Sequence, residues 1–411
     1  MARVLFISAP LPGHIDWGGM HRTAVALQAR GHRVLWVTEA AGTRYLASWG
    51  IPTRVVPESG WLWPPPPMPQ GLSLQERARE RERRAVAVWL EPKRVIPATQ
   101  AFEAVIQEWQ PDVIVAEPFM AGAAFAAERA SLPLIITGWP ATQMPERVPP
   151  HQAEAARLAQ KWFRTLCERL SVRAQYWAPG PLPWLRSPYL HLVYFIPEWY
   201  ATWKVLSPPT VFVGGQVSEP QGPPPPWLPF YLEGEGPRVF ITLGGTFTQD
   251  ESFFLRAVEA ALHVGARVLV ATGNATVAER LRMHVPGEVI VQPWVPFEHV
   301  FPHVDVIVHH GGMGTTHSAL IYGIPQIVVP HAADQYYQAA RVHRLGLGLS
   351  FRVHEATETT LRAGVRALLS EERWKQRARE IASAMASLGG IARAADEVER
   401  VVHTATTGAR Q

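Results

Sequence analysis

The sequence predicts an α/β protein that contains two doubly wound parallel sheets. Three observations point to this class: short β-branched runs alternate with helical stretches, glycine-rich turns follow several of these runs, and the pattern occurs twice along 411 residues. Alternation of strand and helix is typical of βαβ units, whose strands lie parallel. A chain of this length is also expected to form two to three domains of ~150 residues each.

Each half of the chain supplies five candidate strands, separated by amphipathic helices such as residues 20–30 and 121–130. In the first half, the strands are expected at residues 4–8, 34–38, 113–116, 134–137 and 211–213. In the second half, they are expected at residues 239–243, 268–271, 289–292, 306–309 and 326–329. Such short apolar runs, bounded by turn residues, suit strands buried on both faces.

A proline-rich segment separates the two halves. Residues 218–235 include four consecutive prolines, which favour an extended, semi-rigid conformation and suit a connector between domains. We therefore expect a first domain over residues 1–217, a linker over 218–235 and a second domain over 236–390. A C-terminal segment, 391–411, contains one more helix.

Composition excludes several classes of protein. The formal net charge is only +4, which is too small to indicate a nucleic-acid-binding protein. The single cysteine, Cys167, excludes an internal disulfide and a multi-cysteine metal site. Neither a signal peptide nor an apolar run of ~20 residues is found, so we expect a cytoplasmic protein without an integral membrane segment. The oligomeric state is not indicated.

A helix rich in both charges is expected over residues 74–94, after a proline-rich surface loop at 63–69. Arginine and glutamate residues alternate along it, so i,i+4 ion pairs on a solvated face explain its composition. A contact with an anionic membrane surface is the alternative.

The strongest candidate for a binding site is the glycine-rich turn after the strand at 306–309. The sequence there runs His309-His-Gly-Gly-Met-Gly-Thr-Thr316 and then continues as a helix. Glycines let a backbone approach a ligand closely, and the N–H groups of a helix start bind anions. Both threonine hydroxyls can donate hydrogen bonds, and His310 adds an imidazole that can become cationic beside phosphate. The spacing matches neither the Walker A loop nor the Gly-x-Gly-x-x-Gly dinucleotide fingerprint.

Two further strand ends carry groups suited to a nucleotide sugar. Asp334 and Gln335 follow the strand at 326–329, and their carboxylate and carboxamide groups can bind sugar hydroxyls. Trp294 follows the strand at 289–292, and an indole offers a flat face for a nucleobase. Each residue alone indicates little, because an Asp-Gln pair is commonly a helix cap and a tryptophan is commonly core.

Taken together, Trp294-Val-Pro, the His309–Thr316 turn, Gly323-Ile-Pro and Asp334-Gln resemble the donor signature of the UDP-glycosyltransferase superfamily. These are inverting enzymes of the GT-B fold, in which two Rossmann-like domains face a central cleft. The resemblance is dense over residues 240–350 and continues more loosely at the N-terminus. It implies that the helix within 391–411 packs back on the first domain.

The resemblance also implies roles on the donor side. Trp294 would stack on the uracil or thymine ring, and the backbone of Val295 would contact its edge. The diphosphate would be held by four residues of the glycine-rich turn and by one residue of the loop that faces it. These are His310, Gly312, Gly314, Thr315 and, in the facing loop, Thr246.

Donor-sugar hydroxyls would be bound by Asp334 and Gln335, according to the same resemblance. Many family members carry a glutamate that contacts the nucleotide ribose, whereas this chain has Ser318 at that position. The shorter side chain leaves both UDP-sugars and dTDP-sugars open as donors. The resemblance implies neither a bound cofactor nor a required metal ion.

His14 is the candidate catalytic base. It follows the first strand in the sequence Leu11-Pro-Gly-His14, where open α/β sheets place their ligand crevice. An imidazole titrates near neutral pH and can take a proton from an attacking hydroxyl, provided that a carboxylate orients it. In the family this partner is usually an aspartate after a later strand, and here the position holds Glu117. Asp16 is the alternative partner or a group on the donor side, and Asp112 is expected to be structural.

The acceptor is expected to be an apolar small molecule. The regions 59–72 and 140–205, with residue 139, carry a large aromatic load that suits a bulky apolar aglycone. Its members are Trp61, Trp63, Trp139, Trp162, Trp177, Trp184, Trp199 and Trp203, with Met68 and Met144.

The sequence thus predicts an inverting transfer of a hexose, with glucose expected, to a hydroxyl of such an acceptor. A nucleotide-sugar epimerase of the same fold and an inactive nucleotide-sugar-binding partner subunit are the alternatives.

Overall fold

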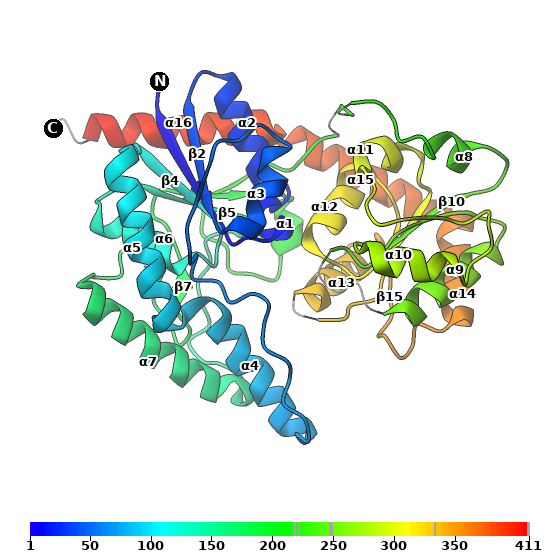
Figure 1. Ribbon diagram of the computed structural model, residues 1–411, viewed down its shortest axis with the longest axis horizontal. Coiled ribbons are helices and arrows are strands. Elements are labelled where there is room, and N and C mark those ends of the chain that lie inside the picture. Colours follow the sequence, from blue (N-terminus) through cyan, green and yellow to red (C-terminus); the bar gives the residue numbers. More distant parts are fainter. Residues whose placement is uncertain (218, 221, 246–249, 333, 409–411) are drawn as a thin grey trace. The chain divides into compact units, whose positions relative to one another are not determined.

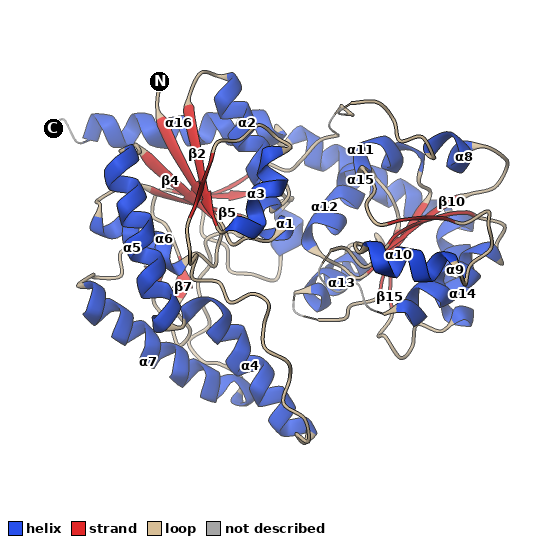
Figure 2. Ribbon diagram, viewed as in Figure 1, coloured by secondary structure: helices blue, strands red, loops and turns tan. Residues whose placement is uncertain are grey.

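The chain forms two compact units in the computed structural model, which describes residues 1–217, 219–220, 222–245, 250–332 and 334–408 (Figure 1). The first unit comprises Met1–Val213 and Ile391–Gln411, and the second comprises Gly214–Gly390. Each unit contains its own parallel sheet, flanked by helices (Figure 2). The chain therefore leaves the first unit once and returns to it with its last helix.

The first sheet has seven strands in the order β3-β2-β1-β4-β5-β8-β9, and all neighbours are parallel. The strands are β1 (Arg3–Ile7), β2 (Arg33–Thr38), β3 (Thr53–Val55), β4 (Val113–Ala116), β5 (Leu134–Thr137), β8 (Leu190–Val193) and β9 (Thr210–Phe212). The strand order reverses at β1, which pairs with β2 on one side and with β4 on the other. In open α/β sheets, the carboxyl edge at such a switch point is where ligands bind.

Helices and a small hairpin complete the first unit. The helices are α1 (Pro12–Asp16), α2 (Met20–Ala29), α3 (Ala40–Ala47), α4 (Leu74–Leu90), α5 (Pro92–Trp109), α6 (Ala121–Arg129), α7 (Ala153–Leu170) and α16 (Gly390–Gly408). Two 3-10 turns, Pro150–Gln152 and Pro197–Tyr200, and the antiparallel pair β6 (Trp177–Ala178) and β7 (Trp184–Leu185) lie in the connections.

The C-terminal helix α16 is held on the first unit by ion pairs. Arg30, at the end of α2, contacts Asp396 at 2.6 Å and Glu399 at 3.0 Å. His32 Nε2 lies 2.8 Å from Glu399 as well. The apolar face of α16 is buried at Ala394, Ala395, Val398 and Val401.

The single helix expected at residues 74–94 is two helices, α4 and α5. Glu91 between them is extended, with φ −67° and ψ 122°, and Pro92 begins α5. A proline lacks the N–H that would continue α4, and it restricts the residue before it to extended conformations, so the break follows from the sequence. Along α4, Glu80 pairs with Arg83 and Arg84, and these hydrogen bonds lower its pKa to about 2.

The second sheet has six parallel strands in the order β12-β11-β10-β13-β14-β15. They are β10 (Arg238–Thr242), β11 (Arg267–Ala271), β12 (Ile290–Gln292), β13 (Val306–His309), β14 (Gln326–Val328) and β15 (Gly348–Ser350). The helices are α8 (Leu228–Leu232), α9 (Glu251–Leu262), α10 (Ala275–Arg282), α11 (Phe297–Val300), α12 (Met313–Ile321), α13 (Gln335–Arg344), α14 (Glu358–Ser370) and α15 (Glu372–Ser387), with a 3-10 turn at Phe301–His303.

Alternate residues of these strands face two separate cores. Val239 and Ile241 of β10 belong to one apolar cluster, whereas Phe240 between them belongs to the other. Burial of both faces explains why the strands are apolar without interruption. The strand order reverses at β10, between β11 and β13, so the second unit also has a switch point.

The described part of the proline-rich segment belongs by its contacts to the second unit, and not to a separate linker. Helix α8 lies within it, and Leu228 and Tyr231 of this helix are buried against the second unit's core. The apolar residues after the prolines explain this attachment. Within the described residues, no helix is both long enough and apolar enough to cross a membrane.

Candidate active site

In the first unit, His14 and Glu117 meet at the carboxyl edge of the sheet. Strands β1 and β4 are neighbours, with Ile7 opposite Ala116, so the segments that follow them emerge side by side. His14 Nδ1 lies 3.0 Å from Glu117 Oε1. The carboxylate is fully buried, whereas the His14 side chain remains 16% exposed.

Glu117 is fixed at both oxygens. Its Oε2 accepts a hydrogen bond from the Phe119 backbone N–H at 3.0 Å, which leaves Oε1 for His14. Because a carboxylate accepts hydrogen bonds, Nδ1 of a neutral His14 carries the ring proton and Nε2 has a free lone pair. This arrangement is the one that a histidine needs to act as a general base.

The other two carboxylates considered from the sequence lie elsewhere. Asp16 Oδ1 is 3.1 Å from His21 Nδ1, and Asp112 Oδ2 accepts from the Arg3 N–H at 2.7 Å. Asp112 therefore ties two strand starts together at the opposite edge of the sheet. Of the three carboxylates, Glu117 is the one that the structure places against His14.

The aromatic residues expected around an acceptor divide into two groups. Trp61 and Phe119 lie beside His14, with Trp139, Trp184 and Trp203 in contact beyond them. Trp177 and Trp199 are core residues, Trp162 packs against the core, and Trp63 is exposed on its loop. Sequence reasoning missed Trp17, whose ring centroid lies 5.7 Å from that of His14.

In the second unit, His309 holds the glycine-rich turn in place. Its Nδ1 accepts from the Gly311 N–H at 3.1 Å, so Nε2 carries the proton and donates to Gln326 Oε1 at 3.0 Å. Burial lowers the pKa of His309 to about 4. This residue is therefore a structural support for the turn.

His310 lies between two glycine-containing loops. A Cβ on Gly244, which follows β10, would stand 2.7 Å from the imidazole, and a Cβ on Gly312 would come closer still. Burial, together with the nearby His309 and His331, lowers the pKa of His310 to about 3. Burial therefore favours the neutral imidazole of His310 in this structure.

The start of helix α12 supplies further donors. Gly312 is its N-cap, and Gly314 and Thr315 lie in its first turn, where backbone N–H groups lack partners within the helix. Thr315 is buried, and the neighbouring Thr316 Oγ1 is buried without a partner among the described residues. This combination of donors suits an anion.

Trp294 presents a largely free indole, with 63% of its surface exposed. A Cβ on Gly245 would lie 2.9 Å from this ring, so the loop after β10 passes between His310 and Trp294. Val295 is half-buried against the core. Thr246 lies outside the described residues.

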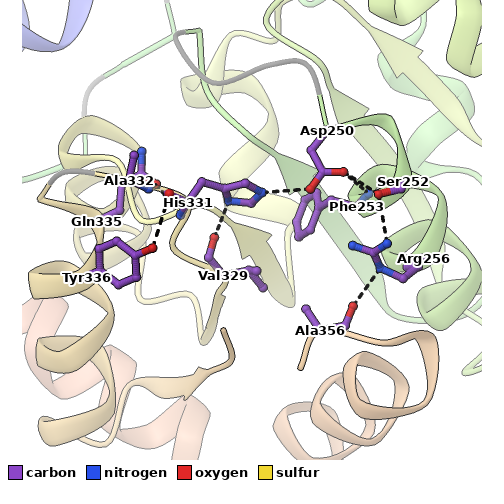
Figure 3. A network of polar contacts seen from close by, with 10 residues as sticks. All are labelled: Asp250, Ser252, Phe253, Arg256, Val329, His331, Ala332, Gln335, Tyr336 and Ala356. Carbon is purple, nitrogen blue, oxygen red and sulfur yellow. Dashed lines mark hydrogen bonds and ion pairs between the residues drawn. The ribbon is translucent and has the colours of Figure 1, made fainter. Parts of the chain in front are cut away.

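The loop before α13 is held by its own polar network (Figure 3). Gln335 is buried, and its Oε1 accepts from the N–H groups of His331 and Ala332 at 2.7 and 2.9 Å. The side-chain oxygen of Gln335 therefore holds the loop in place through these two hydrogen bonds, and its side-chain amide nitrogen is the group that can bind a ligand. Asp334 occupies the N-cap position of α13 without a side-chain capping hydrogen bond, and its Oδ2 lies 3.4 Å from Gln338 Nε2.

Asp250 and His331 form a pair that the sequence did not indicate. His331 Nε2 lies 3.3 Å from Asp250 Oδ2, and its Nδ1 lies 2.8 Å from the Val329 carbonyl (Figure 3). Burial opposes ionisation of Asp250, but hydrogen bonds from Ser252, the Phe253 N–H and His331 lower its pKa overall. The pair joins the loop after β14 to the start of α9, across 81 residues of sequence.

Comparison with known proteins gives matches along the whole chain. Residues 256–400 match the family model of the erythromycin biosynthesis protein CIII-like C-terminal domain. The 4'-demethylrebeccamycin synthase of Lentzea aerocolonigenes is 26% identical over 98% of this chain and 100% of its own length. The elloramycin glycosyltransferase of Streptomyces olivaceus is 36% identical, over 41% of this chain and 42% of its own.

Solved structures agree with the fold. The spinosyn rhamnosyltransferase SpnG superposes with a TM-score of 0.74 at 19% identity, over 97% of this chain and 100% of its own. The glycosyltransferase VinC in complex with dTDP superposes with a TM-score of 0.71 at 22% identity, over 98% of this chain and 100% of its own. The two doubly wound units described above are those of the GT-B fold. The chain thus has the fold of GT-B glycosyltransferases, and in sequence it is similar to glycosyltransferases of the natural-product type.

Proposed function

We propose that the protein transfers a hexose, with glucose expected, from a UDP- or dTDP-sugar to a hydroxyl of an apolar small molecule, with inversion at the anomeric carbon. The observation that carries this proposal is the contact between His14 and Glu117, at the switch point of the first sheet and beside half-buried aromatic rings. It supplies a base oriented by a carboxylate where an apolar alcohol can bind.

The chemistry is a direct displacement. Nε2 of His14 takes the proton of the acceptor hydroxyl while its oxygen forms a bond to the anomeric carbon. The bond from that carbon to the phosphate oxygen breaks on the opposite face, and the nucleoside diphosphate leaves with the electron pair. Glu117, 3.0 Å from Nδ1, stabilises the imidazolium that forms.

On the donor side, the leaving diphosphate gains charge and needs hydrogen-bond donors. We assign this role to the α12 start at Gly312–Thr315, to neutral His310 and to Thr246. Trp294 stacks on the base, and the Val295 backbone contacts its edge. Asp334 and the amide nitrogen of Gln335 bind sugar hydroxyls. In this proposal the protein's own groups carry the charge stabilisation, and no metal ion is required.

Both nucleotides remain candidates. Ser318 is half-buried on α12 and carries a short hydroxyl instead of the carboxylate that contacts the ribose in many family members. Among the similar solved structures, those of VinC and of SsfS6 from Streptomyces sp. SF2575 contain thymidine diphosphate, which supports testing dTDP-glucose beside UDP-glucose.

The test is incubation with each donor, alone and with a set of phenols and polycyclic alcohols. We expect a glycoside of inverted configuration by NMR, formed only when an alcohol is present. A changed sugar without acceptor would instead indicate an epimerase, and no reaction would indicate an inactive binding protein.

His14→Ala tests the assignment of the base. We expect it to lower kcat by ~10²–10⁴-fold and to leave nucleotide affinity unchanged in calorimetry, because the donor groups belong to the second unit. Normal turnover of this variant would refute the role of His14.

A further inference from the structure

His331 links two segments at the carboxyl edge of the second sheet (Figure 3). Its Nδ1 lies 2.8 Å from the Val329 carbonyl oxygen, and its Nε2 lies 3.3 Å from Asp250 Oδ2. The side chain is mostly buried, and its ring meets that of Phe253 edge-on. Both ring nitrogens are therefore held between oxygen atoms of the protein.

The two oxygens decide in which protonation state the ring makes both hydrogen bonds. The Val329 carbonyl only accepts. Burial raises the pKa of Asp250, but hydrogen bonds from three groups, His331 among them, lower it overall, so Asp250 is a carboxylate at neutral pH and also only accepts. A neutral imidazole donates from one nitrogen only. His331 therefore makes both hydrogen bonds as an imidazolium, and loss of its proton leaves a lone pair facing one of the oxygens.

Asp250 uses its two carboxylate oxygens for different contacts. Oδ1 accepts from the Phe253 N–H at 3.0 Å, which makes Asp250 the N-cap of α9, and from the Ser252 hydroxyl at 2.6 Å. A helix N-cap needs only one side-chain oxygen. The second oxygen, Oδ2, contacts a histidine 81 residues away, and capping of α9 does not explain this contact.

The backbone of His331 is in turn bonded to the side chain of Gln335. The N–H groups of His331 and Ala332 donate to Gln335 Oε1 at 2.7 and 2.9 Å. These bonds fix the direction of the Gln335 amide nitrogen. Because the ring of His331 is bonded to α9, the contact with Asp250 restrains the backbone that orients Gln335.

We propose that His331 and Asp250 are a positioning pair for the donor sugar. The imidazolium of His331, held by Asp250, keeps the Gln335 amide nitrogen directed at a sugar hydroxyl, and the pair acts through Gln335 and not by contact with the donor. This inference rests on the proposed function, because it takes Gln335 as a residue that binds the donor sugar. Sugar binding is then linked to protonation of His331, since the contacts are complete with the ring protonated and incomplete at higher pH.

The other polar and ionisable groups around the ring come from three elements. Asp250 belongs to the start of α9, with Arg256 further along the same network (Figure 3). Tyr336 of α13 donates its hydroxyl to the His331 carbonyl oxygen at 3.4 Å. His310, after β13, lies within electrostatic range, and burial lowers its pKa to about 3. Between pH 6 and pH 8, His310 therefore stays neutral and Asp250 stays ionised.

The first test measures donor affinity against pH by calorimetry on the intact protein. UDP-glucose and dTDP-glucose are the probes, because both of their phosphates stay ionised from pH 6 to pH 8. The β-methyl esters of UDP and dTDP carry the same charge but lack the sugar. We expect the dissociation constants of the nucleotide sugars to be about two- to tenfold higher at pH 8, the range of one net hydrogen bond, and those of the esters to be unchanged. An equal pH dependence in the esters, or none in the nucleotide sugars, would overturn the positioning role.

Asp250→Asn should reverse this pH dependence. Asparagine caps a helix as well as aspartate does, so its oxygen keeps the bond from the Phe253 N–H and its NH₂ group takes the place of Oδ2. The NH₂ group donates to His331 Nε2, which must then carry no proton, so the contacts are complete at high pH. We expect this variant to bind the nucleotide sugars more tightly at pH 8 than at pH 6. The same pH dependence as in the wild type would overturn the role of the pair.

Asp305→Asn is the matched control within the same unit. Asp305 also accepts from a backbone N–H, that of Arg238 at 3.0 Å, and contacts a basic side chain, that of Lys375 at 3.4 Å. It lies before β13, at the opposite edge of the sheet. We expect this variant to keep the wild-type pH dependence. A reversal in both variants would show a general effect of charge and would overturn the assignment to His331 and Asp250.

Transfer assays at the same pH values separate this inference from the proposed function. If the wild-type protein bound and transferred the sugar, but its pH dependence matched that of Asp250→Asn, only the positioning pair would be lost. Opposite pH dependences without transfer to any alcohol would keep the positioning pair and remove the transferase. Failure to bind either nucleotide sugar would overturn both.

Discussion

Replacement of Glu117 by glutamine tests how the carboxylate controls the proposed base. The variant is isosteric, so the buried side chain keeps its volume. The Phe119 N–H, 3.0 Å from Oε2, needs an acceptor and therefore holds the amide oxygen. The amide NH₂ group then faces His14 Nδ1, which becomes the acceptor, and the ring proton moves to Nε2. In that tautomer Nε2 cannot take a proton from the acceptor.

The magnitude follows from the two interactions that change. Turning the amide to restore the active tautomer leaves the buried Phe119 N–H unsatisfied, at a cost of ~1–3 kcal/mol. Loss of the charge opposite the imidazolium costs ~1.5–3 kcal/mol more, as for other hydrogen bonds to charged groups. At 1.4 kcal/mol per factor of ten, Glu117→Gln is expected to lower kcat by about 10²–10⁴-fold.

The assay is steady-state glycosyl transfer, with nucleotide affinity measured in parallel. Asp112→Asn is the matched control, because Asp112 also accepts from a backbone N–H but at the far edge of the same strand. We expect this control to retain kcat within about threefold. The reasoning is refuted if Glu117→Gln turns over near the wild-type rate, or if both variants lose activity equally.

Three more predictions concern other residues. Trp294→Ala is expected to weaken nucleotide binding by ~1–3 kcal/mol through lost stacking, and an unchanged dissociation constant in calorimetry would contradict this. Gly244→Ala and Gly265→Ala both place a side chain at positive φ, but only the former meets His310, so only Gly244→Ala should reduce nucleotide affinity while both lower Tm. Burial lowers the pKa of His191 to about 4. Between this value and the ordinary pKa of ~6.5, the unfolded chain binds a proton at His191 that the folded chain does not bind. The free energy of unfolding should therefore fall as the pH is lowered from 6.5 toward 4. Urea unfolding at pH 7, 6 and 5 should show a shallower fall in His191→Gln, and identical slopes would contradict the assignment.

The ten strands expected from the sequence are all present, each within one residue at either end. Apolar β-branched runs flanked by turn residues made them predictable. The strands β3 (Thr-Arg-Val) and β15 (Gly-Leu-Ser) were missed because neither contains an uninterrupted apolar run, and β8 was missed because His191 interrupts its apolar run. His191 is nevertheless buried, since its Nε2 accepts from the Ser187 N–H and its Nδ1 meets the Trp139 carbonyl.

The contact between His14 and Glu117 could be predicted from the sequence, because doubly wound sheets place the strands that precede these residues side by side. Two other properties of the site could not be predicted from the sequence. The pKa of His310 depends on burial by loops distant in sequence, and the Asp250–His331 contact joins segments without a shared motif. Trp17 was missed for a similar reason, because its position beside His14 depends on packing against Gly138, which is distant in sequence.

The return of α16 to the first unit has a consequence for synthesis on the ribosome. Residues 214–390 of the second unit are complete while the first unit still lacks the helix that carries Asp396 and Glu399. Domains generally fold as they emerge, so the first unit can complete its folding only after the second unit has been translated. A nascent chain halted near residue 390 would therefore contain a folded second unit and a first unit that still lacks its last helix.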